Sequence, residues 1–237
     1  LTGIHIGTYG MHLRPRYPLD QLIGEIVAVP GLERVRLSSI EPMQLSRRIT
    51  KLAENCPKIA PHFHICLQSG SNAVLKRMLR PYSRERFAKI VEEIHELLPN
   101  AAIGTDVIVG FPGETEKDHL QTIEFVKKMP FAYVHVFPYS DRQGTTASRM
   151  KGKVSSQDIN LRSQTLRNLS EQKNQAFRSN FIGTQLSVVT LAEEKRGMRV
   201  ALSDNYLKVR LNCSVPPNKI ITGVVEREDR EGYLIIR

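Results

Sequence analysis

One stretch of the sequence combines residue types that could hold a ligand. Residues 104–115 read Gly-Thr-Asp-Val-Ile-Val-Gly-Phe-Pro-Gly-Glu-Thr. The β-branched run predicts a strand, Gly110 and Gly113 permit a tight turn, and Thr115 with the acidic residues after it begins a helix. Ligands of parallel α/β folds bind at the carboxyl ends of strands, where such a turn presents backbone N–H groups without Cβ bulk. Alternatively, the glycines serve only the turn.

Strands and helices alternate around this turn as far as residue 137, which predicts an α/β fold. Apolar runs predict strands at residues 34–37, 63–67, 103–109 and 133–137, and a strand end at residues 1–6. Amphipathic patterns predict helices at residues 19–29, 45–54, 73–78, 84–98 and 115–129. Repeated βα units predict a parallel sheet with right-handed crossovers. Since the chain begins at what reads as the carboxyl end of a strand, we expect a fragment of a longer protein that lacks at least one βα unit.

The pattern changes after residue 138. A polar helix is predicted at residues 156–181, connecting to a segment that is all β. Alternating residues predict five short strands at 185–190, 199–202, 206–211, 220–225 and 233–236. Five such strands favour a small OB-like barrel, a scaffold that often binds oligonucleotides.

Composition limits the classes of protein that this chain can belong to. Its 237 residues contain 41% hydrophobic residues and no run long enough to span a membrane. With no signal-like segment either, we expect a cytoplasmic protein without a membrane partner. The net charge of +10 makes a polyanionic partner plausible. Residues 142–180 carry eight basic side chains against two acidic ones, which is over half of the net charge.

Several motifs resemble one known family in their order and spacing. They are Leu1-Thr-Gly3 with Tyr9-Gly10, Arg36-Leu-Ser-Ser-Ile-Glu-Pro42, His64-Ile-Cys-Leu-Gln-Ser-Gly-Ser71, Thr105-Asp-Val-Ile-Val-Gly-Phe-Pro-Gly-Glu-Thr115, and Phe137-Pro-Tyr-Ser140 with Gly144-Thr145. Together they resemble the radical-SAM methylthiotransferases. The resemblance implies a partial, open parallel βα barrel of radical-SAM type at residues 1–150, a basic connector helix at 151–180, and a TRAM-like β-barrel domain at 181–237.

The resemblance also implies an activity. Leu1-Thr-Gly-Ile-His-Ile-Gly7, Ser38-Ser-Ile-Glu-Pro42 and Asp204-Asn-Tyr-Leu207 look most like the branch that methylthiolates C2 of threonylcarbamoyladenosine next to the tRNA anticodon. The intact protein would then use S-adenosylmethionine (SAM) and [4Fe-4S] clusters, with tRNA as its partner. The alternatives are the branch acting on isopentenyladenosine in tRNA, the branch acting on a ribosomal protein, and an RNA-binding module without catalysis.

The sequence departs from this family in its cysteines. Cys56, Cys66 and Cys213 are far apart, and the chain has neither the CxxxCxxC loop that ligates the SAM-cleaving cluster nor the further cysteines of the N-terminal domain. The chain as given is therefore not expected to catalyse, and no catalytic or metal-ligating residue is assigned. His5, His62 and His64 are expected to be hydrogen-bonded structural residues.

Strand ends are where the resemblance implies that SAM binds. The candidate cofactor-binding residues are Thr2, Gly3, Ser39, Gln68, Ser69, Asp106, Gly110 and Phe111. The glycines could instead serve turns, and the serines could cap helices. For RNA, the candidates are Arg162, Arg167 and Arg178 on the connector helix and Arg196, Arg199, Tyr206, Lys208 and Arg210 on the β domain. The alternative for these is a solvated charged surface.

Overall fold

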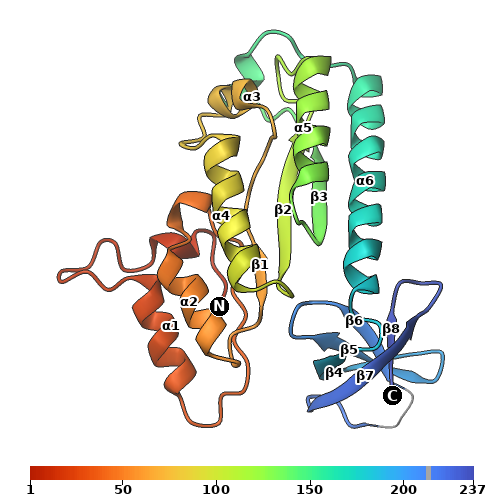
Figure 1. The fold of residues 1–237 in the computed structure, drawn as a ribbon. Coiled ribbons are helices and arrows are strands. Elements are labelled where there is room, and N and C mark those ends of the chain that lie inside the picture. Colours follow the sequence, from red (N-terminus) through yellow and green to blue (C-terminus); the bar gives the residue numbers. More distant parts are fainter. Residues whose placement is uncertain (212–214) are drawn as a thin grey trace. The chain divides into compact units, whose positions relative to one another are not determined.

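The computed structural model describes residues 1–211 and 215–237. Cys213 therefore lies outside the described residues. The chain divides into two compact units, Leu1–Glu171 and Gln172–Arg237, and the boundary falls inside the long helix α6 (Ser156–Ser179). Figure 1 shows the elements of both units in sequence order.

Unit 1 contains a three-stranded sheet in the order β1-β2-β3. Its strands are β1 (His62–His64), β2 (Ala102–Val109) and β3 (Tyr133–Pro138). Its other helices are α1 (Leu19–Ala28), α2 (Arg47–Asn55), α3 (Asn72–Arg77), α4 (Arg84–Leu97) and α5 (Glu116–Lys128), with 3-10 turns at Ile6–Thr8, Pro42–Gln44 and Ala147–Arg149. Both strand pairs are parallel, with Gly104 opposite His64 on one side and opposite Tyr133 on the other. This arrangement confirms the open parallel βα region.

The strand predicted at residues 34–37 and the strand end predicted at residues 1–6 do not form regular strands in the structure. Near residues 34–40 the structure contains only isolated parallel bridges, Val35 with Ile59 and Ile40 with Ile65. Backbone bonds there alternate between neighbours: Ile65 donates to Gly104, whereas Cys66 donates to Ile40 at 3.4 Å. Within the described residues, pairing on this side of β1 is limited to these single bridges. Residues 6–8 form a 3-10 turn instead of a strand end, because the backbone N–H and hydroxyl of Thr8 both donate to the carbonyl of His5.

Local signals explain why the helices form where the sequence predicts them. Side chains of Ser46, Ser71, Ser83 and Thr115 cap the N-termini of α2, α3, α4 and α5. In α5 the cap is reciprocal, because the Asp118 carboxylate also accepts from the Thr115 backbone. The apolar face of α4 is fully buried at Phe87, Val91 and Ile94, where it packs into the core of unit 1.

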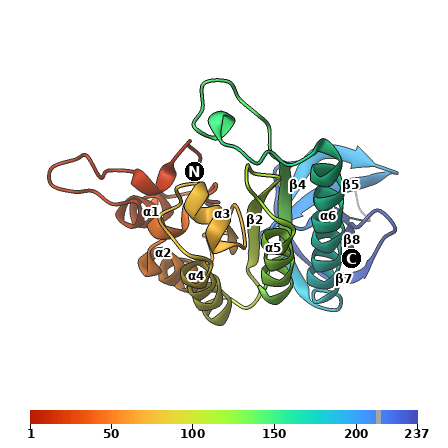
Figure 2. The same cartoon turned by 90° about the horizontal axis from the view of Figure 1, so that it is seen from above.

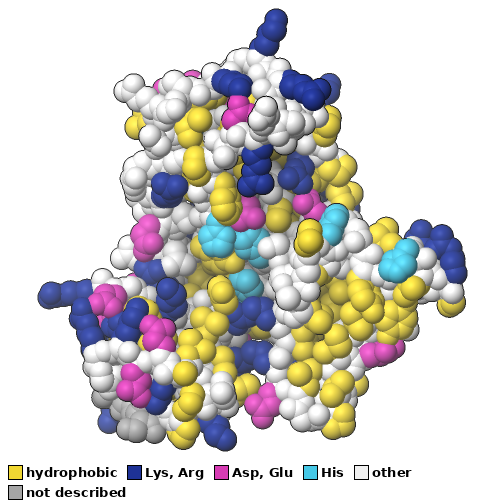
Figure 3. All heavy atoms as spheres, turned by 180° about the vertical axis from the view of Figure 1, so that it is seen from behind, with side chains coloured by type: hydrophobic (Ala, Val, Ile, Leu, Met, Phe, Trp, Pro, Cys, Tyr) yellow, Lys and Arg dark blue, Asp and Glu magenta, His cyan; other side chains and the backbone are white. Residues whose placement is uncertain are grey.

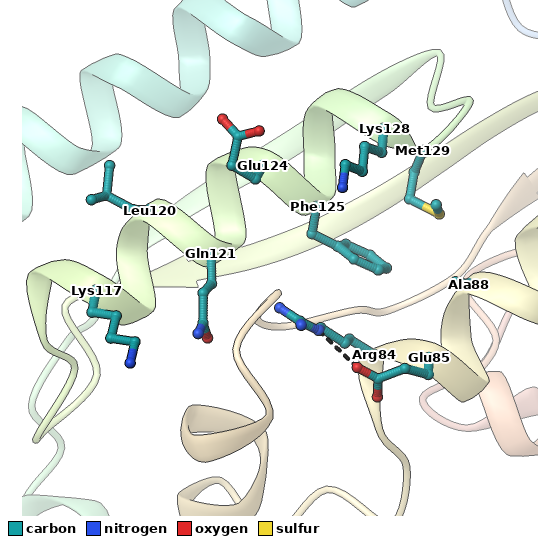
Figure 4. Close-up of a pocket in the computed structure, with 10 residues that line it drawn as sticks. All are labelled: Arg84, Glu85, Ala88, Lys117, Leu120, Gln121, Glu124, Phe125, Lys128 and Met129. Carbon is teal, nitrogen blue, oxygen red and sulfur yellow. Dashed lines mark hydrogen bonds and ion pairs between the residues drawn. The ribbon is translucent and has the colours of Figure 1, made fainter.

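Helices α4 and α5 lie side by side on the outer face of the sheet (Figures 1 and 2). A pocket of about 530 Å³ lies between them. In Figure 4 the ring of Phe125 points into this pocket, and Arg84 is paired with Glu85 at its rim. The pocket is mainly apolar and contains none of the candidate site residues.

Unit 2 is a closed five-stranded barrel in the order β4-β5-β6-β8-β7. The strands are β4 (Gln185–Lys195), β5 (Met198–Ser203), β6 (Lys208–Leu211), β7 (Ile220–Glu228) and β8 (Leu234–Ile236). All neighbours are antiparallel except β6 and β8. The predicted five strands are confirmed, although β4 and β7 extend beyond their predicted ends through register shifts after Thr190 and Val225. Among the described helices, none is long and apolar enough to cross a membrane.

Candidate functional site

Alternate residues of the three parallel strands form one polar face of the sheet in unit 1. Strand pairing aligns His64 with Gly104 and Tyr133, and places His135 opposite Asp106. The intervening residues of β2, including Thr105 and Val107, are fully buried. Figure 3, seen from the side opposite to Figure 1, shows histidine side chains that gather beside acidic ones on this face. Sequence periodicity predicted the strands, but their register alone brings these polar residues together.

Tyr133 and Asp106 link the histidines into one network. The Tyr133 hydroxyl lies 2.8 Å from His62 Nε2 and 3.2 Å from His64 Nδ1. On the other side of His64, Nε2 is 2.9 Å from Asp106 Oδ1, and His135 Nδ1 is 3.4 Å from the same oxygen. The Tyr133 hydroxyl thus gives both His62 and His64 a hydrogen-bond partner.

Gly104 allows the Tyr133 ring to lie across β2. A Cβ at position 104 would fall well inside van der Waals contact with that ring, and a side chain there would displace it. The ring stacks on His62 with centroids 6.0 Å apart and lies 4.9 Å from the ring of His135. Gly104 is thus required by close approach to an aromatic ring and not by a turn.

Burial and neighbouring charges shift the pKa values at this face. Burial, reinforced by Arg36, lowers the pKa of His62 to about 3, which keeps this imidazole neutral. Burial also raises the pKa of the Cys66 thiol to about 12, with Asp106 adding to the shift. For Asp106, burial opposes ionisation, but contacts with His135 and His64 outweigh it and hold the pKa below its usual range. The Asp106 carboxylate is therefore the anionic group at this face.

A pocket of about 680 Å³ adjoins Asp106 at the carboxyl ends of the strands. Three of the sequence-predicted cofactor residues, Gln68, Asp106 and Phe111, line it together. The remaining lining residues come from the end of β2 and from β3 and the loop after it: Ile108, Phe137, Pro138, Tyr139, Ser140, Arg142, Thr145 and Ala147. The predicted list did not include these residues, although the Phe137-Pro-Tyr-Ser140 motif pointed to this loop.

Gln68 has an unusual backbone at the edge of this pocket. Its φ of 68° lies in the left-handed region, which costs a non-glycine residue roughly 1–3 kcal/mol. The surroundings enforce it, because the N–H of Gln68 donates to the Asp106 carbonyl at 2.8 Å and its carbonyl accepts from Ile108 at 2.9 Å. Strain of this kind that the surrounding structure imposes is typical of ligand sites.

The turn after β2 is built around a buried ion pair. Glu114 accepts from the Gly110 N–H at 2.9 Å, and its other carboxylate oxygen is 2.8 Å from Arg162 on α6. Gly110 has a φ of 78°, and a side chain there would meet Ile159. Gly110 therefore shapes the turn, which presents Phe111 to the pocket, and does not line the pocket itself.

The other predicted cofactor residues lie outside the pocket lining. Thr2, Gly3 and Ser39 are exposed. Ser69 is buried, and its hydroxyl contacts Thr122 and accepts from the N–H of Ser71. Its surroundings match the alternative in which this serine supports a helix start, since Ser71 is the N-cap of α3.

Three arginines predicted to bind RNA have their guanidinium groups in internal ion pairs. Arg162 pairs with Glu114, Arg178 with Glu228 at 2.8 Å, and Arg210 with Asp229 and Glu231. Their side chains are each exposed by less than a tenth. A buried arginine that is already paired offers little charge to a phosphate, so the structure argues against direct RNA contacts by these three.

The remaining RNA candidates are more accessible. Arg167, Arg196, Tyr206 and Lys208 are exposed. Arg196 contacts Glu231, and Arg199 is largely covered while paired with Glu194 at 2.6 Å. Arg167 on α6 and the exposed residues of the β domain therefore keep their predicted role as proposals.

Known proteins are similar to this chain in sequence. The family model described as "Radical SAM superfamily" matches residues 7–126. Threonylcarbamoyladenosine tRNA methylthiotransferase MtaB from Aquifex aeolicus is 40% identical over 89% of this chain and 50% of its own length. The protein of the same name from Bacillus subtilis is 41% identical over 88% of this chain and 47% of its own length.

A sister enzyme and a solved structure extend the comparison. The tRNA-2-methylthio-N(6)-dimethylallyladenosine synthase of Thermobifida fusca is 37% identical over 83% of this chain and 40% of its own length. The radical SAM enzyme coproporphyrinogen III oxidase of Escherichia coli aligns over 64% of this chain and 34% of its own, with 17% identity and a TM-score of 0.45. The chain spans about half the length, or less, of the curated relatives it matches. With the superfamily model covering residues 7–126, the chain belongs to the radical SAM superfamily.

Proposed function

We propose that this chain is the SAM-binding and RNA-binding part of a tRNA methylthiotransferase that acts at C2 of threonylcarbamoyladenosine. The observation that carries the proposal is the identity of about 40% to two proteins of that name over nearly nine-tenths of the chain. The pocket at the strand ends gives this likeness a physical site, because it combines apolar walls with a few polar groups.

The pocket fits SAM in the kinds of group that it presents. Phe111 and Phe137 offer aromatic surface for an adenine ring, and Gln68 offers an amide that can both donate and accept. Asp106 lines the same pocket and is anionic, so it can pair with the cationic part of SAM. When bound, SAM supplies the radical chemistry of this superfamily, while these residues bind it, orient it and exclude water.

The cluster does not fit the residues of this chain. Within the described residues the free cysteines are Cys56, after α2, and Cys66, after β1. A [4Fe-4S] cluster requires several thiolates at one place, whereas Cys66 has His64 and Asp106 as its neighbours. We therefore assign no radical-generating step to these residues.

Exposed residues on each of the two units, taken separately, are the proposed RNA contacts. Arg167 and Lys208 are exposed cations, and exposed Tyr206 offers a ring on which an unpaired base can stack. The net charge of +10 favours a polyanion in general. Cations of this kind would contact phosphates and position the RNA without reading its sequence.

Nucleoside mass spectrometry of tRNA from a strain in which this gene is deleted tests the proposal. We expect methylthio-threonylcarbamoyladenosine to disappear while methylthio-isopentenyladenosine persists. The gene expressed as the intact protein should restore the nucleoside, and so should a Gln121→Ala control of that protein, because Gln121 lies in the outer pocket between α4 and α5. A Gln68→Ala variant should not restore it, because Gln68 lines the proposed SAM pocket.

Other outcomes would redirect the assignment. Loss of methylthio-isopentenyladenosine instead would contradict the proposal and favour the sister branch, whose Thermobifida fusca member is 37% identical. No change in either nucleoside would also contradict it, and would favour a ribosomal-protein substrate or an RNA-binding module without catalysis.

A further inference from the structure

We propose that His64, Cys66 and Asp106 form a binding site for a divalent transition metal ion, with Zn²⁺ as the best match. The three donors are one imidazole nitrogen, one thiol sulfur and one carboxylate oxygen, and all lie within 4.8 Å of one another. Its mixed donor set differs from the cysteine thiolates that hold an iron–sulfur cluster. It does not depend on the proposed tRNA substrate, but it shares Asp106 with the proposed SAM pocket, so a bound ion would replace the pairing of Asp106 with the cationic part of SAM.

The strands bring these donors together from distant parts of the sequence. His64 ends β1, Cys66 follows it two residues later, and Asp106 lies on β2. His64 Nε2 is 2.9 Å from Asp106 Oδ1, and Cys66 Sγ is 3.7 Å from Asp106 Oδ2. Small shifts of side chains could therefore place all three around one ion.

Two of the donor atoms lack a well-formed hydrogen bond. Within the described residues, His64 Nε2 and Asp106 Oδ1 are both buried, yet neither takes part in a hydrogen bond of acceptable geometry. Their contact of 2.9 Å is close but poorly aligned. Buried polar atoms normally find a partner, so two such atoms that converge with a thiol require a physical reason. A shared metal ion would satisfy both.

The chemistry of the donors selects the metal. A sulfur, a nitrogen and an oxygen ligand suit zinc, whereas magnesium and calcium prefer all-oxygen sites. Three protein ligands leave one position open on a tetrahedral zinc ion, as in catalytic zinc sites. Asp106 also lines the pocket at the strand ends, so the open position would adjoin that pocket.

The surrounding residues already hold the ligands in place. The Tyr133 hydroxyl contacts His64 Nδ1 at 3.2 Å, which leaves Nε2 as the ring nitrogen available to a metal. His135 approaches Asp106 at 3.4 Å and can orient that carboxylate. Outer partners of this kind fix the tautomer and direction of metal ligands. Gly104 makes the arrangement possible by admitting the Tyr133 ring.

Titration of the reduced, metal-free chain with Co²⁺ alone, followed by displacement with Zn²⁺, tests the site. We expect one equivalent of Co²⁺ to bind with a thiolate-to-cobalt charge-transfer band. Cys66→Ser should abolish the band. Cys56→Ser should retain it, because Cys56 lies at the end of α2, away from these donors, and Cys213→Ser should retain it as well. A band that survives in Cys66→Ser, or no binding by the unmodified chain, would overturn the proposal.

Two further measurements guard against a variant that simply misfolds. X-ray absorption of the zinc-loaded, unmodified chain should show one sulfur together with nitrogen and oxygen ligands, and a shell without sulfur would overturn the proposal. Tyr133→Phe keeps all three ligands but removes the hydroxyl beside His64 Nδ1. It should weaken Zn²⁺ binding roughly 10- to 100-fold with the circular dichroism spectrum unchanged. Unaltered affinity in this folded variant would contradict the site geometry.

Discussion

The buried ion pair between Arg162 and Glu114 provides a quantitative test of how α6 holds the turn beside the pocket. The two side chains are 9% and 5% exposed, and Arg162 Nη1 lies 2.8 Å from Glu114 Oε1. Arg162→Met removes the cation and leaves the carboxylate buried without its partner. The loss of one member of a buried pair costs about 3–5 kcal/mol, so we expect unit 1 to lose stability of this order.

The expected loss of stability depends on pH. Burial raises the pKa of Glu114 although Arg162 opposes the shift, so the folded state holds this proton to a higher pH than the unfolded state does. Glu114 therefore contributes stability below the unfolded pKa of 4.5, and this contribution is lost as pH rises through the folded pKa. Removal of Arg162 should raise the folded pKa further. The variant should thus be destabilised more at pH 7 than at pH 5.

Thermal unfolding of the matched variants measures this effect. For a unit of this size, about 3–5 kcal/mol corresponds to a lowering of the melting temperature by roughly 6–20 °C. Arg167→Met is the control, since Arg167 is exposed on the same helix, and it should change little. Glu114→Gln combined with Arg162→Met should recover much of the loss, because no buried charge remains. Equal melting temperatures for Arg162→Met and Arg167→Met would refute the reasoning.

Four other predictions follow from single features of the structure. Gln68→Gly removes left-handed strain, so it should raise the free energy of unfolding by up to about 1 kcal/mol while weakening SAM binding in calorimetry; a less stable variant that still binds SAM would contradict this. Gly104→Ala should cost about 1–3 kcal/mol in chemical denaturation by displacing Tyr133, whereas the control Gly24→Ala should cost nothing because a Cβ there meets open space. Asp118→Ala removes the α5 capping box and should cost about 1–2 kcal/mol near neutral pH. Since hydrogen bonds from Ser71 and Thr115 outweigh burial and lower the Asp118 pKa, that difference should shrink in melts as pH falls below 4. Arg167→Ala should leave the melting temperature unchanged but reduce, by about 1, the slope of the logarithm of tRNA affinity against the logarithm of salt concentration. An unchanged slope would mean that Arg167 does not contact RNA.

Replacement of Arg162, Arg167 and Arg178 together is a poor test of RNA binding. The sequence favours that experiment because all three are cations on one helix. In the structure, Arg162 pairs with the buried Glu114 and Arg178 with the half-buried Glu228, so their removal would lower affinity by damaging the fold. Replacement of Arg167 alone removes a positive charge without removing a buried ion pair, so it tests RNA binding without changing the stability of the fold.

Local signals in the sequence determined most of the secondary structure. The helices were predictable because their caps and apolar periodicity lie within a few residues, as with Ser83 and the buried face of α4. Alternation predicted the five barrel strands in the same way. The motif at residues 104–115 also located the turn beside the pocket. The sequence predicted a strand at residues 34–37, but the structure has only isolated bridges there. The local pattern could not show this, because strand pairing depends on neighbours that lie elsewhere in the sequence.

The sequence likewise predicted some residues of the site, whereas others became apparent only from the tertiary structure. Gln68, Asp106 and Phe111 were candidates from the sequence motifs; Gln68 and Phe111 follow strands, Asp106 lies within β2, and the structure places all three in one pocket. The partners of Arg162, Arg178 and Arg210 lie between 19 and 50 residues away, so only the tertiary structure shows that these charges are already paired. The same holds for His64, Cys66 and Asp106, whose spacing in the sequence gives no sign of a metal site. Strand register decides which side chains converge, and register is set by packing between segments far apart in the chain.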